Sequence, residues 1–256
     1  MKLRQTIGLG LFALFLCTGT AVASDDLKVV QEKGEITMAM SGQYPPFNFV
    51  DDQNHLTGFD VEIGNEIAKR IDVKGTPVST AWDGIIAGLL ANKYELICGS
   101  MAITEERLKS IDFSDPYYRS GAQLFVKKGS ALTSVADLDG KKVGVTLGTT
   151  YEKWVRENIP NVDIRTYKGV PDMILEVSTG RIDGFITDRI VGALAIKKND
   201  MPIDLAGDLL YEEKMGIAMR KGNTDLKKAV DTALAAMKED GSYHDISMKW
   251  LGIDVR

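Results

Sequence analysis

Two segments place hydroxyl groups where a predicted strand runs into a predicted helix. Residues 98–107, "CGSMAITEER", carry Ser100 and end on Arg107, and residues 144–154, "GVTLGTTYEKW", carry Thr149 and Thr150. The free N–H groups and the dipole at a helix start both favour an anion. Neither segment contains GxGxxG or a Walker lysine, so the pattern does not favour a nucleotide. It predicts anion sites whose ligand need not be a phosphate.

The residue types that hold metals or act as nucleophiles are sparse. His55 and His244 are far apart in polar segments, without cysteine or carboxylate neighbours at metal-ligand spacing. A zinc site or a serine-histidine triad is therefore not expected. We predict no metal, no cofactor and no catalytic residue.

The first 23 residues have the features of a secretory signal peptide. Lys2 and Arg4 are followed by an apolar run over residues 7–17 and by the small-x-small sequence that ends at Ala23. This order predicts residues 1–23 as a signal peptide that is cleaved after Ala23. No later stretch approaches the roughly 20 apolar residues of a membrane span. We expect a mature protein exported to the periplasm.

The two cysteines have different expected fates. Cys17 follows Leu16, whereas signals for lipid attachment usually have a small residue before the cysteine, so cleavage without lipid is favoured. Removal of the signal leaves Cys98 alone, which excludes an intramolecular disulfide. Cys98 lies in an apolar run, and we interpret it as a buried small hydrophobic residue rather than a reactive thiol.

Size and charge narrow the class of protein further. Without residues 1–23, 29 basic residues face 36 acidic ones, a net charge of −7. Such a chain has no basic patch for nucleic acid. The remaining roughly 230 residues can bury a large core, as one domain or as two lobes.

Strand-like and helical patterns alternate along the chain. Residues 58–71, "GFDVEIGNEIAKRI", have apolar residues at helical spacing, with Asp60 near the start. The same rhythm predicts strands at 34–40, 94–100, 121–129, 141–146, 162–167 and 182–187, and helices at 81–93, 148–159, 171–181, 188–199 and 223–252, the last broken at Gly241. This order is typical of an α/β protein with largely parallel sheets.

Several motifs together carry a family resemblance. The segments "YPPFNF", "WDGIIAGLL", "GSMAITEERLKSIDFSDPYY", "DLDGKKVGVTLGTT", "GRIDGFITD", "KMGIAMRKGN" and "KWLG" occur in that order over nearly the whole mature chain. They resemble the bacterial extracellular solute-binding proteins of the polar amino acid family, which feed ATP-driven (ABC) importers. The resemblance implies a two-lobed α/β periplasmic binding protein fold with two hinge crossings. It also implies an amino acid ligand, a permease partner and a monomer.

The resemblance divides the chain into lobes that are not consecutive in sequence. Lobe 1 would comprise residues 24–117 and 216–256, and lobe 2 residues 118–215, including the hinge segments. The two crossings would lie near residues 118–121 and 213–216. This division explains why no linker is visible in the composition.

Site residues follow from the resemblance, position by position. Arg107 would clamp the ligand's α-carboxylate with its planar fork, Ser100 would meet the amino group through its carbonyl, and Thr149 would donate to the carboxylate from a helix start. The alternative for Arg107 is a surface pair with Glu105 or Glu106.

The remaining predicted contacts concern the ammonium group and the aliphatic part of the ligand. Asp188 would accept the ammonium group, and it also fits an N-cap of the helix that follows. Tyr44 and Trp82 would form aromatic walls. Many relatives have Ser or Thr where this chain has Ala102, and the loss of that hydroxyl contact could cost about 1 kcal/mol.

The sequence leaves the ligand open between an acidic amino acid and a neutral one such as cystine. Relatives that bind cationic amino acids often have an aspartate three residues before the pocket tyrosine, where this chain has Ser41. Arg189 and Arg119 leave glutamate and aspartate possible. Several stretches are most similar to the cystine-binding branch, so we expect cystine or another neutral polar amino acid.

Two other functions are compatible with the same fold. Exported cyclohexadienyl dehydratases share it, but they need a general acid, and the one carboxylate placed in the cleft, Asp188, is assigned to the ammonium group. A sensor that presents its ligand to a receptor is the other alternative.

Overall fold

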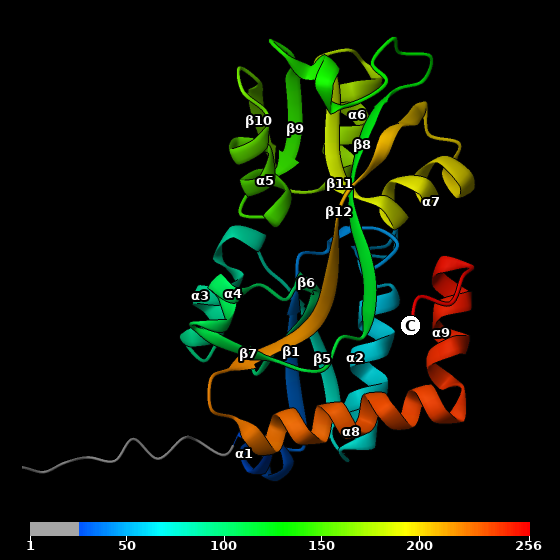
Figure 1. The fold of residues 1–256 in the computed structure, drawn as a ribbon. Helices are drawn as coiled ribbons and strands as arrows, with labels where there is room; N and C mark the ends of the chain where they lie inside the picture. Colours follow the sequence, from blue (N-terminus) through cyan, green and yellow to red (C-terminus); the bar gives the residue numbers. More distant parts are fainter. Residues whose placement is uncertain (1–25) are drawn as a thin grey trace, which may run out of the picture.

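The computed structural model describes residues 26–256, without the side chains of residues 198 and 199 (Figure 1). The predicted signal peptide and Cys17 lie outside these residues. Within the described range, no helix is long and apolar enough to cross a membrane. Figure 1 shows two α/β lobes, one above the other, with two long strands running between them.

Lobe 1, the lower one in Figure 1, is built on parallel strands. Strand β1 (Glu35–Met40) pairs with β5 (Lys74–Ser79) on one side and with β6 (Leu96–Ala102) on the other. The short strands β2 (Gln43–Tyr44), β3 (Asn48–Val50) and β4 (Leu56–Thr57) form a separate small sheet. The helical elements of this lobe are α1 (Asp26–Lys33), α2 (Phe59–Arg70), η1 (Trp82–Gly84), α3 (Ile85–Leu90), α4 (Glu105–Leu108), α8 (Thr224–Asp240) and α9 (Ser242–Leu251).

Lobe 2 repeats the strand-then-helix arrangement. Strand β9 (Lys142–Thr146) pairs in parallel with β10 (Asp163–Tyr167) and with β11 (Gly184–Asp188). The helical elements are η2 (Val135–Leu138), α5 (Thr150–Asn158), α6 (Val170–Ser178) and α7 (Arg189–Asn199). Buried aliphatic residues of β9 and α5, such as Val143 and Val155, contribute to the core of this lobe.

The two lobes share one sheet through a pair of long antiparallel strands. Strand β8 (Tyr118–Lys127) pairs with β12 (Ile203–Arg220), and the pairing is irregular between Ala206 and Tyr211. The strand order is β10-β9-β11-β8-β12-β6-β1-β5, with β7 (Ile111–Phe113) on β12. A Cβ atom at Gly121 would lie 2.2 Å from the Tyr211 carbonyl oxygen, so only glycine allows this close approach.

The alternating order predicted from the sequence is confirmed in most of its elements. Helix α2 buries Val61, Ile63 and Ile67 against lobe 1, as the helical spacing of its apolar residues predicts. The C-terminal helical segment is broken at Gly241, which adopts a left-handed conformation between α8 and α9. The two-lobed fold with two crossings is therefore confirmed, whereas the limits 24–117, 118–215 and 216–256 stay a prediction.

Candidate ligand-binding site

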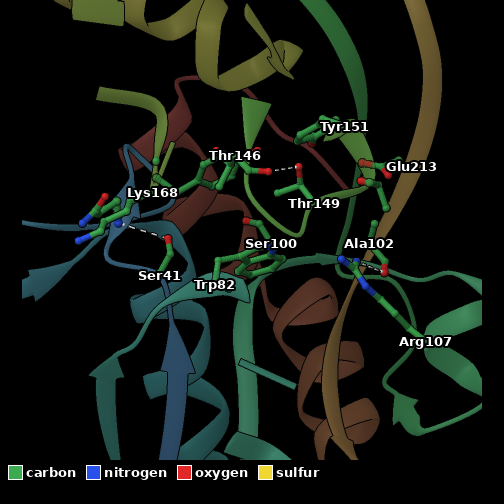
Figure 2. Close-up of a pocket in the computed structure, with 15 residues that line it drawn as sticks. Ser41, Trp82, Ser100, Ala102, Arg107, Thr146, Thr149, Tyr151, Lys168 and Glu213 are labelled. Carbon is green, nitrogen blue, oxygen red and sulfur yellow. Dashed lines mark hydrogen bonds between the residues drawn. The ribbon is translucent and has the colours of Figure 1, made fainter. Parts of the chain in front are cut away.

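A pocket lies between the lobes, at the carboxyl ends of several strands. Six of the seven predicted site residues line it: Tyr44, Trp82, Ser100, Ala102, Arg107 and Thr149 (Figure 2). They come from segments that follow β1, β5, β6 and β9 or end them, which is where ligands bind in open α/β sheets. Asp188, the seventh, is not among the lining residues.

Arg107 is held in place by the segment that carries it. The Thr104 hydroxyl accepts a hydrogen bond from the Arg107 N–H at 3.2 Å, and Arg107 Nη1 donates to the carbonyl oxygen of Ala102 at 2.8 Å. The guanidinium also lies over the Trp82 ring, 5.9 Å from its centroid. In the described residues Glu106 pairs with Lys153 at 2.6 Å, and no ion pair joins Arg107 to either neighbouring glutamate. The surface-pair alternative is therefore not what the structure shows.

Ser100 adopts a backbone conformation that is uncommon for serine. Its φ of 59° lies in the left-handed region, and such conformations persist only where the surroundings hold them. The Ser100 N–H donates to the Tyr117 hydroxyl at 2.9 Å, and the Ser100 hydroxyl donates to Asp60 Oδ2 at 2.9 Å. Ser100 lines the pocket, and both its N–H and its hydroxyl donate to groups of lobe 1.

Asp60, which the sequence placed only at a helix start, is the centre of this arrangement. Its fully buried carboxylate also accepts from Asn48 Nδ2 at 2.7 Å and from the Tyr117 hydroxyl at 2.6 Å. Asn48 Oδ1 in turn accepts from the Ser41 hydroxyl at 2.9 Å. Burial raises the pKa of Asp60 to about 6, although these donors oppose the shift. One buried acid therefore positions both serines of the pocket.

Thr149 caps helix α5. Its hydroxyl oxygen accepts from the Glu152 N–H at 3.2 Å, and its hydroxyl donates to the Thr146 carbonyl oxygen at 2.6 Å (Figure 2). Thr150 and Tyr151, the first residues of α5, also line the pocket. The helix start is therefore at the pocket, and the carboxylate contact of Thr149 stays a prediction.

Asp188 lies beside the pocket and is fully buried. Its Oδ1 accepts from the Ser120 hydroxyl at 2.8 Å and from the N–H groups of Ile190 and Val191 at 2.7 and 3.4 Å. The N-cap role predicted for Asp188 is thus confirmed. Its Oδ2 has no hydrogen-bond partner in the described part of the chain. Burial raises the pKa of this carboxyl to about 7, and the negative charge of Glu213 adds to the shift.

Two charged residues of the pocket were missed in the sequence. Glu213 lies on the crossing strand β12, is 9% exposed and lines the pocket, and its Oε2 has no partner among the described residues. Burial raises its pKa, although hydrogen bonding to Thr150 and the charge of Arg107 oppose the shift. Lys168 lines the pocket after β10. It precedes Gly169 at a strand-to-helix junction, the same signal that led to Ser100 and Thr149, whereas Glu213 has no comparable signal.

Other predicted features are placed away from the pocket. Cys98 is fully buried, as predicted, and its Sγ contacts the Asp60 carbonyl oxygen at 3.2 Å. His55 and His244 are exposed and lie beside Asp51 and Asp254 respectively. Within residues 26–256, no cluster of His, Cys, Asp or Glu could hold a metal ion.

Comparison with known proteins assigns most of the chain to one family. The family described as bacterial extracellular solute-binding proteins, family 3, matches residues 36–253. The L-cystine-binding protein TcyJ of Escherichia coli (strain K12) is 40% identical over 258 residues, which cover 98% of this chain and 97% of that protein.

Two solved structures show the same fold. A mutant of ArgBP from T. maritima has a TM-score of 0.84 and 33% identity, and the match covers 89% of this chain and 99% of that one. The ancestral amino acid-binding protein AncCDT-1, named as a precursor of cyclohexadienyl dehydratase, has a TM-score of 0.83 and 36% identity over 88% of this chain and 99% of its own.

Proposed function

The chain belongs to family 3 of the bacterial extracellular solute-binding proteins, and on this basis we propose that it binds an amino acid for an ABC importer, with cystine as the ligand. Its similarity to a protein named for L-cystine binding, over nearly the full length of both chains, supports cystine. Another neutral polar amino acid is the alternative.

The observation that carries the proposal is the placement of opposite charges in one pocket between two lobes. Arg107 and the start of α5 offer donors to a carboxylate, and Glu213 offers an acceptor. Asp188 lies close enough to Glu213 for the two charges to interact. Such an arrangement is suited to a zwitterion, whose α-carboxylate would bind Arg107 and whose ammonium group would bind the acidic pair Glu213 and Asp188.

Closure of the lobes would follow because the residues proposed to bind the two ends of the ligand lie on different lobes. Arg107 and Ser100 belong to lobe 1, and Asp188 and Thr149 belong to lobe 2, so an open form could satisfy only one end of the ligand. A ligand shifts a hinge equilibrium by its different contacts in the two states. We therefore propose that the amino acid closes the cleft and that a permease recognises the closed form.

A cationic amino acid is disfavoured by the chemistry at Ser41. This residue lines the pocket three positions before Tyr44, and its hydroxyl is bonded to Asn48 rather than presented beside a carboxylate. A ligand guanidinium at this wall would lose water without gaining an ion pair. The neighbourhood of Ser41 therefore does not favour a cationic ligand side chain.

The location and partners follow as part of the same proposal. The family is extracellular, and we propose the periplasm as the compartment, reached through cleavage of residues 1–23. We propose a monomer that delivers its ligand to a permease. A sensor role would differ in its partner, so pull-down of a receptor instead of a permease would favour it.

One feature of the pocket favours the dehydratase alternative, whereas the names of the relatives do not. Glu213 is a second pocket carboxylate with a raised pKa, as a general acid needs. The relatives, however, are named as binding proteins, and AncCDT-1 itself is named as amino acid-binding. Prephenate turnover by the purified protein would favour the enzyme, and its absence together with cystine binding would favour the binding protein.

A thermal-shift screen over the common amino acids and cystine tests the proposal. A ligand at 100 times its Kd stabilises the folded state by about 2.7 kcal/mol, which raises the melting temperature measurably. We expect the largest rise with cystine. A rise with lysine, arginine or histidine alone would overturn the ligand assignment, and no rise with any amino acid would overturn the proposed function.

A further inference from the structure

The charges that line the pocket exceed what one simple amino acid can use. Its charged lining residues are Arg107, Lys168 and Glu213. A neutral zwitterion requires one cation for its carboxylate and one anion for its ammonium group. Arg107 and Glu213 meet these needs, which leaves Lys168 without a ligand group in the proposed function.

Lys168 lies apart from the other two charges. Figure 2 shows it on the opposite side of the pocket from Arg107 and Glu213, near Ser41. The Lys168 side chain is exposed, and no ion pair or side-chain hydrogen bond of Lys168 occurs among the described residues. Its charge is therefore available to a ligand.

The backbone around Lys168 is also suited to an anion. Gly169 is the N-cap of the nine-residue helix α6, and no side chain caps it. A Cβ atom at Gly169 would lie 2.5 Å from the carbonyl oxygen and 2.5 Å from the Cβ of Gln43, so this backbone is seated directly on lobe 1. The positive end of the α6 dipole and the Lys168 ammonium thus act on the same corner of the pocket.

The cations suggested by the sequence are placed elsewhere. Arg189 Nη1 donates to Gln123 Oε1 at 3.1 Å, and Arg119 is exposed on β8. Neither lines the pocket. Among the described residues, the positively charged side chains that line the pocket are Arg107 and Lys168.

We propose that Lys168 binds a second carboxylate of the ligand, so that the pocket selects amino acids with a carboxylate at each end. Cystine, with two α-carboxylates joined through a disulfide, has this chemistry, and so does glutamate. The inference rests on the proposed function, because it takes Arg107 as the site of the first carboxylate. It adds a reason why a pocket of this family would prefer cystine to a single neutral amino acid.

The test compares ligands with and without the second carboxylate. Isothermal titration calorimetry would measure cystine, glutamate and S-methylcysteine against the wild type, Lys168→Gln and Lys168→Arg. S-methylcysteine keeps one amino acid end and a sulfur but lacks the second carboxylate. We expect Lys168→Gln to weaken cystine binding about tenfold or more, Lys168→Arg to keep it within about threefold, and S-methylcysteine to be unaffected.

A matched control and the opposite results make the test decisive. Lys128→Gln removes an exposed lysine of lobe 2 outside the pocket and should leave every affinity unchanged. Unchanged cystine affinity in Lys168→Gln, or an equal loss for S-methylcysteine, would overturn the inference while leaving the proposed amino acid-binding function intact. Binding of glutamate but not cystine, with the same dependence on Lys168, would support the second carboxylate and overturn cystine as the ligand. Failure of all three ligands would overturn the inference and cystine as the ligand, whereas the amino acid-binding function would be overturned only if the thermal-shift screen also finds no ligand.

Discussion

The two walls of the pocket are bonded in different ways. On the lobe 1 wall, Ser41, Ser100 and Arg107 are each fixed by hydrogen bonds to groups of their own lobe, and Asp60 uses both carboxylate oxygens. On the opposite side, Asp188 Oδ2 and Glu213 Oε2 have no partner within the described residues.

This difference indicates how the two walls contribute to binding. A buried carboxylate whose two oxygens both accept hydrogen bonds within the protein stabilises the fold and has no oxygen free for a ligand. A buried carboxylate with an unpaired oxygen lowers the stability unless a cation binds to it. We infer that lobe 1 presents a preformed half-site and that the acidic pair Glu213 and Asp188 becomes fully satisfied when the ligand's ammonium group arrives. Variants of the two walls should therefore separate stability from affinity.

The largest expected difference between affinity and stability is at the acidic pair Glu213 and Asp188. Asp188→Asn should weaken ligand binding by about a hundredfold, because it removes a buried charge from the ammonium site. The stability of the empty protein should not fall, since asparagine is also a good N-cap, and it should rise at neutral pH because the costly buried charge is removed. Calorimetry and urea unfolding measure the two quantities, with Glu213→Gln as the matched variant on the crossing strand. A lower apo stability with an unchanged Kd would make Asp188 purely structural.

For Asp60, the acid of lobe 1, a loss of stability is expected together with a loss of affinity. Asp60→Ala would leave the buried donors of Asn48, Tyr117 and Ser100 without an acceptor, so the free energy of unfolding should fall by at least about 2 kcal/mol. Affinity should also fall, because Ser100 loses the contacts that hold its left-handed backbone. Asp60→Asn, which keeps one acceptor, should lose less stability. An unchanged free energy of unfolding in Asp60→Ala would contradict the inference that Asp60 holds a preformed half-site on lobe 1.

The dependence on pH should differ in sign between stability and affinity. The folded-state pKa values of Asp60, about 6, and Asp188, about 7, lie above that of an unfolded aspartate, about 3.9. From about pH 4 to 7 the folded protein therefore binds more protons than the unfolded chain. Its free energy of unfolding falls as pH rises over this range, by at most about 1.4 kcal/mol per pH unit for each of the two acids. An ammonium group beside Asp188 favours the charged carboxylate, so affinity should rise over the same range.

Urea unfolding and calorimetry between pH 5 and about pH 8 would record both slopes. Asp188→Asn supplies the control, because it should flatten the pH dependence of affinity and keep the part of the stability slope that belongs to Asp60. Affinity that falls with rising pH in the wild type would contradict an ammonium contact at the acidic pair.

The smallest effect is expected at the start of α5. Thr149→Ala removes the cap on Glu152 and the bond to Thr146, which should cost about 1 kcal/mol of stability and about a fivefold loss of affinity. Thr149→Ser should restore both quantities, because its hydroxyl can make the same bonds. Unchanged values in the alanine variant would show that this corner does not shape the pocket.

The sequence predicted most of the helices and the shorter parallel strands because their signals are local, but it did not predict the long strand β12. The apolar spacing over residues 58–71 gives α2, and Gly241 breaks the last helical segment, as expected from its conformational freedom. Pocket residues at strand-to-helix junctions, such as Ser100 and Thr149, could be found by the same reasoning. Lys168 carries that signal too and was missed because none of the segments that carry the family resemblance includes it.

Other parts of the site depend on tertiary structure alone. Glu213 is an interior residue of β12, and its place in the pocket follows from how that strand crosses between the lobes. Asp188 is fully buried, and its carboxylate accepts a hydrogen bond from Ser120 of β8, 68 residues away in sequence. Asp60 showed only a helix-start signal, although its main bonds reach Asn48, Ser100 and Tyr117.

The central claim is that a zwitterionic amino acid binds between the lobes with its α-carboxylate on Arg107. Calorimetric titration of L-cystine into the wild type and into Arg107→Lys tests it most directly. The account predicts one binding site per wild-type chain and a loss of about a hundredfold or more in Arg107→Lys, because a lysine keeps the charge but cannot make two parallel hydrogen bonds. An equal Kd for the two proteins would contradict it.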